Sequence, residues 1–302
     1  MKSALPLLFM GLMVSLFSCR TNSSDQQKEP SDKPLKVTFS LSEVWATDTL
    51  LRTPESALYD ESRDVIYVSN VNLNPRQKDG NGFISKVSTT GEILDLYWVD
   101  GLSSPKGMGL YGNILYTTDI DEIVSIDVEK GEIINKIALE KAGMFNDISV
   151  DASGKVYISD MDSSRIYVLE DNRLSLFKEG DLNLPNGVYV EEDRLYIGEV
   201  GINTLSVYAF SSGEKTALTG EMGRPDGIVP ATVPGYYFVS DWQGEVFVVN
   251  PAGEKTSLLN TKAAEINAAD IWLIPSENLL LVPTFFGNRL VAYQVNISEE
   301  GE

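Results

Sequence analysis

The clearest pattern of hydrophobic and polar positions lies at residues 145–160. A loop with two polar side chains leads into a short apolar strand, an Asp-Ala-Ser-Gly turn follows, and a second strand alternates apolar and polar residues. The same order recurs at 185–197 and at 225–241. The first polar residues of the three loops lie 40 residues apart at each step, and they are Asn146, Asn186 and Asp226.

A repeat of this length with several strands per unit is typical of β-propeller blades, which bury their faces only against neighbouring blades. We therefore predict an all-β fold, a six-bladed β-propeller with four-stranded blades at residues 36–297. The last unit offers only three strands, at 270–274, 278–282 and 288–295, whereas an alternating stretch at 36–48 precedes the first unit. We expect this N-terminal strand to complete the last blade and close the ring, which removes an open sheet edge.

The first 18 residues contain one lysine and then an apolar run whose length is typical of a signal peptide and short for a membrane span. The run ends Leu-Phe-Ser-Cys, which resembles the lipobox of bacterial lipoprotein precursors, where cleavage before the cysteine leaves it lipidated. We therefore predict a signal peptide at 1–18, lipidation of Cys19 and a bacterial cell-envelope location, in the periplasm or at the cell surface. A plain secretory signal with a chance cysteine is the alternative.

Polar residues and proline dominate the stretch after the cysteine, so we expect a disordered tether at 19–35 and, after the propeller, a short tail at 298–302. The formal net charge is −20, from 44 acidic and 24 basic residues. The acidic residues are spread over turns and linkers, which favours a solvated surface over recognition of a cationic partner. Without a basic patch we expect no nucleic-acid partner. We expect a monomer that binds a small molecule and meets the membrane only through its lipid.

The chain contains no histidine, and Cys19 is its only cysteine. Histidine-based triads, histidine metal sites and histidine general bases are therefore excluded. A disulfide within the chain and a site with several cysteine ligands are excluded as well.

Loops that enter the innermost strands at the same phase of the repeat come together at one mouth of a propeller channel. In blades one to six this phase is occupied by Glu55, Lys106, Asn146, Asn186, Asp226 and Ala269. Singly, such residues are ordinary turn formers. Together, two carboxylates and two amides offer hard oxygen donors, which suit a divalent metal ion. We expect calcium, with magnesium, manganese or zinc as alternatives.

These motifs resemble the senescence-marker-protein/gluconolactonase family, the regucalcin-like six-bladed propellers, over residues 50–295. The resemblance implies that Glu55, Asn186 and Asp226 are metal ligands and that Asp226 is also the general base. Asn146 matches an asparagine that contacts the substrate or, in more distant relatives, the ion. Two positions depart from the family, because Ser56 replaces a glycine and Met144 replaces an arginine that contacts sugar lactones.

Other polar residues near this mouth have less specific interpretations. Lys106 either binds an anionic group of the substrate or points to solvent from its turn. Asp147 and Asp270 follow the ring positions directly and are expected to be structural, accepting backbone hydrogen bonds. The second strand of a blade often ends in an acidic residue. We expect these acids to be solvated or to cap backbone N–H groups, and they are Asp119, Asp160, Glu199 and Asp241. Trp242, Trp272, Phe285 and Phe286 are expected to pack between blades.

The resemblance and the oxygen donors predict a metal-dependent hydrolase that opens a lactone or cleaves an ester at a calcium site in the channel mouth. In this interpretation Asp226 is the catalytic residue, Glu55, Asn186, Asp226 and Asn146 hold the metal, and Asn146 and Lys106 contact the substrate. The alternative is a non-catalytic lipoprotein whose calcium ion plugs the channel and whose rims bind or scaffold other molecules. Ser56 and Met144 favour the alternative, whereas the four oxygen donors favour catalysis.

Overall fold

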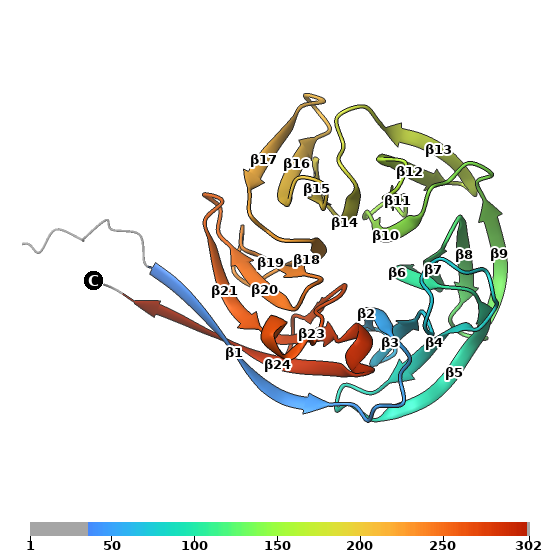
Figure 1. Ribbon diagram of the computed structural model, residues 1–302, viewed down its shortest axis with the longest axis horizontal. Coiled ribbons are helices and arrows are strands. Elements are labelled where there is room, and N and C mark those ends of the chain that lie inside the picture. Colours follow the sequence, from blue (N-terminus) through green and yellow to red (C-terminus); the bar gives the residue numbers. More distant parts are fainter. Residues whose placement is uncertain (1–35, 301–302) are drawn as a thin grey trace, which may run out of the picture.

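The structure is a computed structural model that describes residues 36–300. The predicted signal peptide, Cys19 and the tether lie outside the described residues. Six four-stranded antiparallel sheets are arranged as the blades of a propeller around a central axis (Figure 1). The six-bladed, all-β prediction is therefore confirmed.

Each of the first five blades is a simple meander whose strands follow one another in sequence. Blades one to three contain β2 (Pro54–Asp60), β3 (Val65–Asn70), β4 (Gly82–Val87), β5 (Ile93–Leu102), β6 (Pro105–Tyr111), β7 (Ile114–Asp119), β8 (Glu122–Asp127), β9 (Glu132–Ala138), β10 (Phe145–Val150), β11 (Val156–Asp160), β12 (Arg165–Glu170) and β13 (Arg173–Lys178). Blades four and five contain β14 (Pro185–Glu191), β15 (Arg194–Glu199), β16 (Thr204–Ala209), β17 (Lys215–Thr219), β18 (Pro225–Pro230), β19 (Tyr237–Asp241), β20 (Glu245–Val249) and β21 (Lys255–Asn260).

The sixth blade joins the two ends of the described chain. Its strand order is β1-β24-β23-β22, which places β1 (Lys36–Ala46) outermost and antiparallel to β24 (Leu290–Glu300). The inner strands are β22 (Trp272–Ile274) and β23 (Leu279–Pro283). The predicted closure by the N-terminal strand is confirmed. Because β24 runs to Glu300, residues 298–300 belong to this blade and not to a tail.

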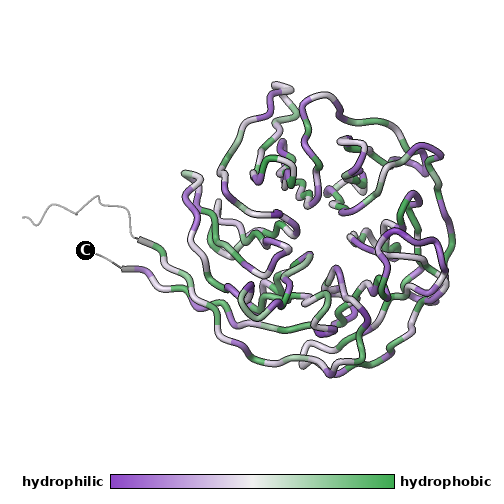
Figure 2. The backbone as a smooth tube through the Cα atoms, in the orientation of Figure 1, coloured by the Kyte–Doolittle hydropathy of each residue, from purple (hydrophilic) through white to green (hydrophobic). Residues whose placement is uncertain are grey.

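Hydrophobic side chains are buried mainly between adjacent blades. Six clusters of buried residues each join two neighbouring blades. Between blades one and two, for example, Leu58 and Tyr67 pack with Met108 and Leu115. Figure 2 shows hydrophobic segments within the blades and hydrophilic segments at many of the turns. Repetition of one interface thus supplies the core that no single blade could form.

Helical structure is minor in the part of the chain that the structure describes. Two short 3-10 helices lie in connections between strands: η1 (Lys262–Ala264) between β21 and β22, and η2 (Phe285–Gly287) between β23 and β24. Between residues 36 and 300 we find no helix long and apolar enough to cross a membrane.

Candidate functional site

The same irregularity occurs at the start of the innermost strand in blades one to five. In β18, Pro225 pairs with Asp241 and Ile228 with Val239, so three steps on one strand oppose two on the other. Equivalent register shifts occur in β2, β6, β10 and β14. An extra residue of this kind is a β-bulge, which bends the strand and redirects side chains. The first bulged residues are the predicted ring residues Glu55, Lys106, Asn146, Asn186 and Asp226.

Buried hydroxyl groups satisfy the backbone that the bulges leave unpaired. Ser69, Ser159 and Ser240 accept hydrogen bonds from the second bulged residue of their blades, at 2.9, 2.9 and 2.8 Å. Ser240 also donates to the carbonyl of Ala269 in the next blade at 2.7 Å. Because buried backbone groups need partners, these serines hold the bulges in place.

Buried polar side chains at the ends of the second strands fix the loops that lead into the bulges. Asp160, for example, accepts from the N–H groups of Gly143 and Met144, and its side chain is fully buried. Analogous hydrogen bonds link Asp119 to residues 103 and 104, Glu199 to 183, Asp241 to 224 and Asn70 to 52. The capping interpretation of these acids is therefore confirmed, and the solvated one is wrong because all four acids are buried.

The five ring side chains line one cavity of about 230 Å³ at one end of the channel. The inner strands that carry them surround the axis in Figure 1. The remaining walls are formed by Pro75, Arg76, Met144, Met161, Arg224, Trp242, Phe285 and Phe286. Residues that are far apart in sequence therefore meet in one pocket, whereas Ala269 is buried in a small apolar cluster beside it.

Four buried oxygen atoms in this cavity have no hydrogen-bond partner: Glu55 Oε2, Asn146 Oδ1, Asn186 Oδ1 and Asp226 Oδ2. A buried acceptor without a partner costs free energy of folding. Four such oxygens in one cavity therefore indicate a bound group that would satisfy them. Two carboxylates and two amides fit the donor preference of a divalent cation such as calcium. Within residues 36–300 no three His, Cys, Asp or Glu side chains gather closely enough to hold a metal ion, so a site here would draw on amide oxygens as well as the two carboxylates.

The two ring carboxylates lie in an environment that disfavours their charge. Burial raises the pKa of Glu55 well above its usual range, and the charges of Asp226 and Asp270 raise it further. Burial likewise raises the pKa of Asp226, with Asp270 adding to the effect and Arg224 opposing it. A divalent cation among these oxygens would reverse both shifts, because an opposite charge favours the ionised form.

Lys106 is buried, with only 3% of its surface exposed, so the interpretation that it points to solvent is wrong. Its Nζ donates to Ser104 O at 3.0 Å, Ser104 Oγ at 2.9 Å and Pro75 O at 3.2 Å. Burial lowers the pKa of Lys106 to about 8, against the opposing effect of Glu55. The three hydrogen bonds hold the amine in place, and at neutral pH, which is below its pKa, it is a positively charged part of the cavity wall.

The carboxyl groups of Asp147 and Asp270 lie deeper in the channel. Asp147 accepts from Val188 N at 2.7 Å and from Ile148 N at 2.6 Å, which confirms its structural interpretation. Asp270 instead accepts from the Ser56 hydroxyl at 2.5 Å. Both acids also line a second, more apolar cavity of about 460 Å³, formed farther along the same inner strands and away from the unpaired oxygens.

Several residues of the first cavity were not anticipated as site residues. Trp242 of blade five and Phe285 and Phe286 of blade six form an aromatic cluster on its wall with ring centroids 4.9 to 6.1 Å apart. Their predicted packing between blades is therefore confirmed, and they line the cavity as well. Trp272 also packs between blades. Arg224 also lines the cavity, and its position two residues before Asp226 was an available signal for it.

The fold and this site define a propeller of the gluconolactonase-like kind. The model of the SMP-30/gluconolactonase/LRE-like region matches residues 54–274, and the chain belongs to that family. No curated protein matches the sequence significantly.

Solved structures with the same fold have diverse functions. A gluconolactonase from Xanthomonas campestris is 16% identical, with a TM-score of 0.66, covering 82% of this chain and 87% of its own. A virginiamycin B lyase from Staphylococcus aureus is 14% identical, with a TM-score of 0.60, covering 86% and 99%. A chain of a nidogen/laminin complex is 18% identical, with a TM-score of 0.56, covering 68% and 82%. At these identities the likeness concerns the fold alone.

Proposed function

We propose that the protein is a divalent-metal-dependent hydrolase that opens lactones or cleaves carboxylic esters, with calcium as the ion. Family membership supports a lactonase-like propeller. The observation that carries the proposal is the set of four buried, unpaired oxygens in one cavity. Lipid attachment at Cys19, a cell-envelope location and a monomeric state belong to the proposal and rest on the sequence alone.

In this mechanism Glu55, Asn186 and Asp226, with Asn146 beside them, would hold the ion. The bound ion would polarise the scissile carbonyl and stabilise the negative charge that develops on its oxygen. Asp226 accepts a proton at a carboxylate oxygen as the water oxygen adds to the carbonyl carbon. The carbon–oxygen bond of the ring or ester then breaks, and the proton passes to the departing alkoxide, so the products are a hydroxy acid or an acid and an alcohol.

Two other functions fit the cavity less well. A channel plug would need the four oxygens but not the cationic and aromatic walls of a 230 Å³ cavity. Lyase chemistry of the virginiamycin B lyase kind meets a different objection. A form of that lyase in which alanine replaces a histidine is catalytically inactive, and this chain contains no histidine.

Replacement of Asp226 by Asn tests the proposal, because the amide keeps an oxygen ligand and loses the base. We expect the purified wild type to contain calcium and to hydrolyse members of a panel of lactones and esters, with loss of activity in EDTA. Asp226→Asn should bind calcium more weakly, but excess calcium should restore its thermal stabilisation. Its kcat should stay about 10² to 10⁴ times lower than that of the wild type, since a general base contributes about that much.

Asp100→Asn is the matched control, because Asp100 is exposed on β5 and lines neither cavity. This variant should keep wild-type activity and calcium affinity. Equal rates in calcium-saturated Asp226→Asn and wild type would show that Asp226 is not the base. A wild type that binds calcium and hydrolyses nothing in the panel would favour the plug.

A further inference from the structure

The cavity carries more positive charge than the acidic chain as a whole would suggest. Its walls contain three cationic side chains, Arg76, Lys106 and Arg224, and two carboxylates, Glu55 and Asp226. A divalent cation would balance the two carboxylates, and Asp162 balances Arg76 from outside the cavity lining, so the charges of Lys106 and Arg224 would remain. In a site partly shielded from water, such an excess favours binding of an anion.

Two of the three cationic groups already have partners in the protein. Arg76 forms a two-point ion pair with Asp162, at 2.5 and 3.2 Å. Lys106 donates to Ser104 and Pro75. The guanidinium of Arg224, by contrast, makes no hydrogen bond or ion pair with any residue between 36 and 300, and its central carbon lies 5.0 Å from the Trp242 ring centroid.

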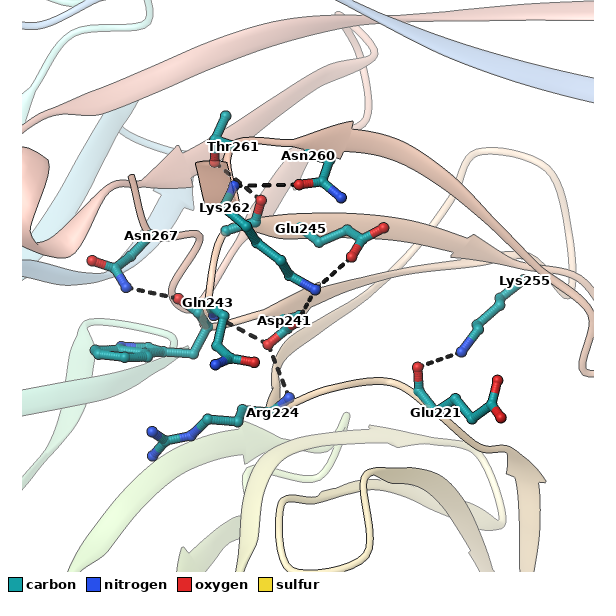
Figure 3. A network of polar contacts seen from close by, with 12 residues as sticks. Glu221, Arg224, Asp241, Gln243, Glu245, Lys255, Asn260, Thr261, Lys262 and Asn267 are labelled. Carbon is teal, nitrogen blue, oxygen red and sulfur yellow. Dashed lines mark hydrogen bonds and ion pairs between the residues drawn. The ribbon is translucent and has the colours of Figure 1, made fainter. Parts of the chain in front are cut away.

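The backbone around Arg224 is held firmly although its side chain is unpaired. Its N–H donates to Asp241 Oδ1 at 2.9 Å, and its carbonyl accepts from Trp242 N at 2.9 Å. Asp241 is itself paired with Lys262 at 2.6 Å. Figure 3 shows this network and the guanidinium of Arg224 extending away from it. Because the backbone is already fixed, binding of a ligand needs to order only the side chain of Arg224.

Gly223 is required for this loop conformation. Its φ is +70°, in the left-handed region that glycine tolerates best, and a Cβ there would lie 2.2 Å from the Asp241 carboxylate. The chain therefore approaches Asp241 closely enough for the carboxylate to bind the next N–H group, which is that of Arg224.

An aromatic surface lies next to the guanidinium. Trp242 contacts both Arg224 and the rings of Phe285 and Phe286, and Phe286 is 61% exposed. A guanidinium beside a partly buried tryptophan and an exposed phenylalanine suits a ligand that combines a carboxylate with an apolar ring. The carboxylate pairs with the guanidinium in a two-point geometry, and the apolar ring packs on the aromatic side chains.

We propose that Arg224 determines the specificity of the hydrolase site and that the substrate is a lactone or ester carrying a carboxylate and an apolar, ring-sized substituent. The inference rests on the proposed function. The substrate's carboxylate binds Arg224, its apolar part packs against Trp242 and Phe286, and its scissile carbonyl reaches the oxygen ring formed by Glu55, Asn146, Asn186 and Asp226.

The kinetic test uses a matched pair of substrates with saturating calcium: a phenyl-substituted γ-lactone with a carboxymethyl group, and its neutral carboxamide. We expect the wild type to prefer the acid at least tenfold in kcat/KM. Arg224→Gln should abolish this preference by raising KM for the acid more than for the amide, because a contact away from the reacting carbonyl stabilises the ground state and the transition state equally. Loss of the charge that lowers the pKa of Asp226 acts on the rates of both substrates alike, so the ratio between them isolates the contact. Arg224→Lys should recover part of the preference.

The control variant is Arg173→Gln, which removes the same charge from an exposed position on β13 outside both cavities. It should leave the preference intact. A wild type that hydrolyses both substrates equally well, or an Arg224→Gln variant that still prefers the acid, would overturn the proposal.

A binding experiment keeps the proposal testable if the protein hydrolyses neither substrate. Phenylacetate and the neutral phenylacetamide are titrated into the calcium-loaded full chain by calorimetry. We expect the wild type to bind phenylacetate more tightly than phenylacetamide and Arg224→Gln to lose about tenfold in affinity for phenylacetate alone, roughly the 1.4 kcal/mol of one good contact. Unchanged affinity in Arg224→Gln would mean that the carboxylate binds elsewhere.

Discussion

At the scale of single residues, the pair of Ser56 and Asp270 shows how one substitution alters the channel. Ser56 stands where the resembling family has glycine, and its hydroxyl donates to the Asp270 carboxyl deep in the channel. Burial raises the pKa of Asp270 to about 7, and the hydrogen bond from Ser56 opposes this effect. In the unfolded chain the pKa of Asp270 is near the ordinary 3.8. The folded protein therefore binds a proton on Asp270 more tightly than the unfolded chain does.

The sign of the resulting pH dependence follows from this shift. The stabilisation by the Asp270 proton is complete below pH 3.8 and is lost as the pH rises through about 7. Burial raises the pKa values of Glu55, Asp147 and Asp226 as well, which acts in the same direction. We therefore expect the melting temperature in EDTA to be lower at pH 8 than at pH 5.5.

Asp270→Asn should reduce this difference in melting temperature between the two pH values. The lowered pKa of Lys106 has the opposite effect on stability, because the unfolded chain binds the Lys106 proton more tightly and lowering the pH therefore favours unfolding. Asp100→Asn serves again as the control and should keep the full difference. Identical differences in Asp270→Asn and wild type would show that Asp270 does not titrate on folding.

The sequence predicted that five of the six ring residues lie together at one cavity, but it missed their neighbours there, for a physical reason. Position in a repeat determines which side chains a bulge directs to the axis, so a period of 40 residues was sufficient to bring Asn146, Asn186 and Asp226 together. Arg224 and Phe286 reach the cavity because of the conformations of their loops and the directions of their side chains. A sequence repeat carries no information about either. The burial of Lys106 depends on the insertion after β3, which supplies the carbonyl of Pro75.

At the scale of structural elements, the bulges at the starts of the innermost strands of blades one to five form the site, and buried serine hydroxyls hold those of blades one, three and five. In blade five, Ser240 is fully buried and bridges Gly227 N and Ala269 O, which belong to adjacent blades. The bridge thus links the loop carrying Asp226 to the blade that closes the ring.

Ser240→Ala should destabilise the protein by about 1–3 kcal/mol, since two buried backbone groups lose their partner. We also expect calcium affinity to fall, because the bulge that orients Asp226 is no longer held. Chemical denaturation and calcium titration measure the two effects. Ser175→Ala, at an exposed position on β13, should change stability by less than about 0.5 kcal/mol. A stability of Ser240→Ala equal to that of this control would contradict the assigned role.

At the scale of the whole molecule, ring closure was predictable and the detailed blade boundaries were less so. An N-terminal strand without a partner and a last unit with one strand too few leave one economical arrangement, and the structure adopts it. The strand ends were harder to place, since β24 reaches Glu300 and β1 stops at Ala46. The pairing of two strands distant in sequence decides where each one ends, and local pattern does not contain that information.

Deletion of residues 36–48 should destabilise the propeller far more than deletion of 21–34. The first deletion removes β1 and exposes the edge of β24, whereas the second only shortens the predicted tether. We expect the β1 deletion to lower the melting temperature by more than about 10 °C or to cause aggregation, and the tether deletion to shift it by less than about 2 °C. Equal melting temperatures would contradict a closing role for β1.

The pairing of β1 with β24 also determines how the molecule would respond to mechanical force. The strands are antiparallel, so Lys36 faces Glu300 at the outer end of the pair and Ala46 faces Val291 at the inner end. A force that pulls the two chain ends apart would break the cross-strand hydrogen bonds one after another, beginning at that outer pair, instead of loading them all at once. The register shift between Glu43 and Trp45 lies near the inner end, so a long regular stretch must open before the blade itself is disturbed.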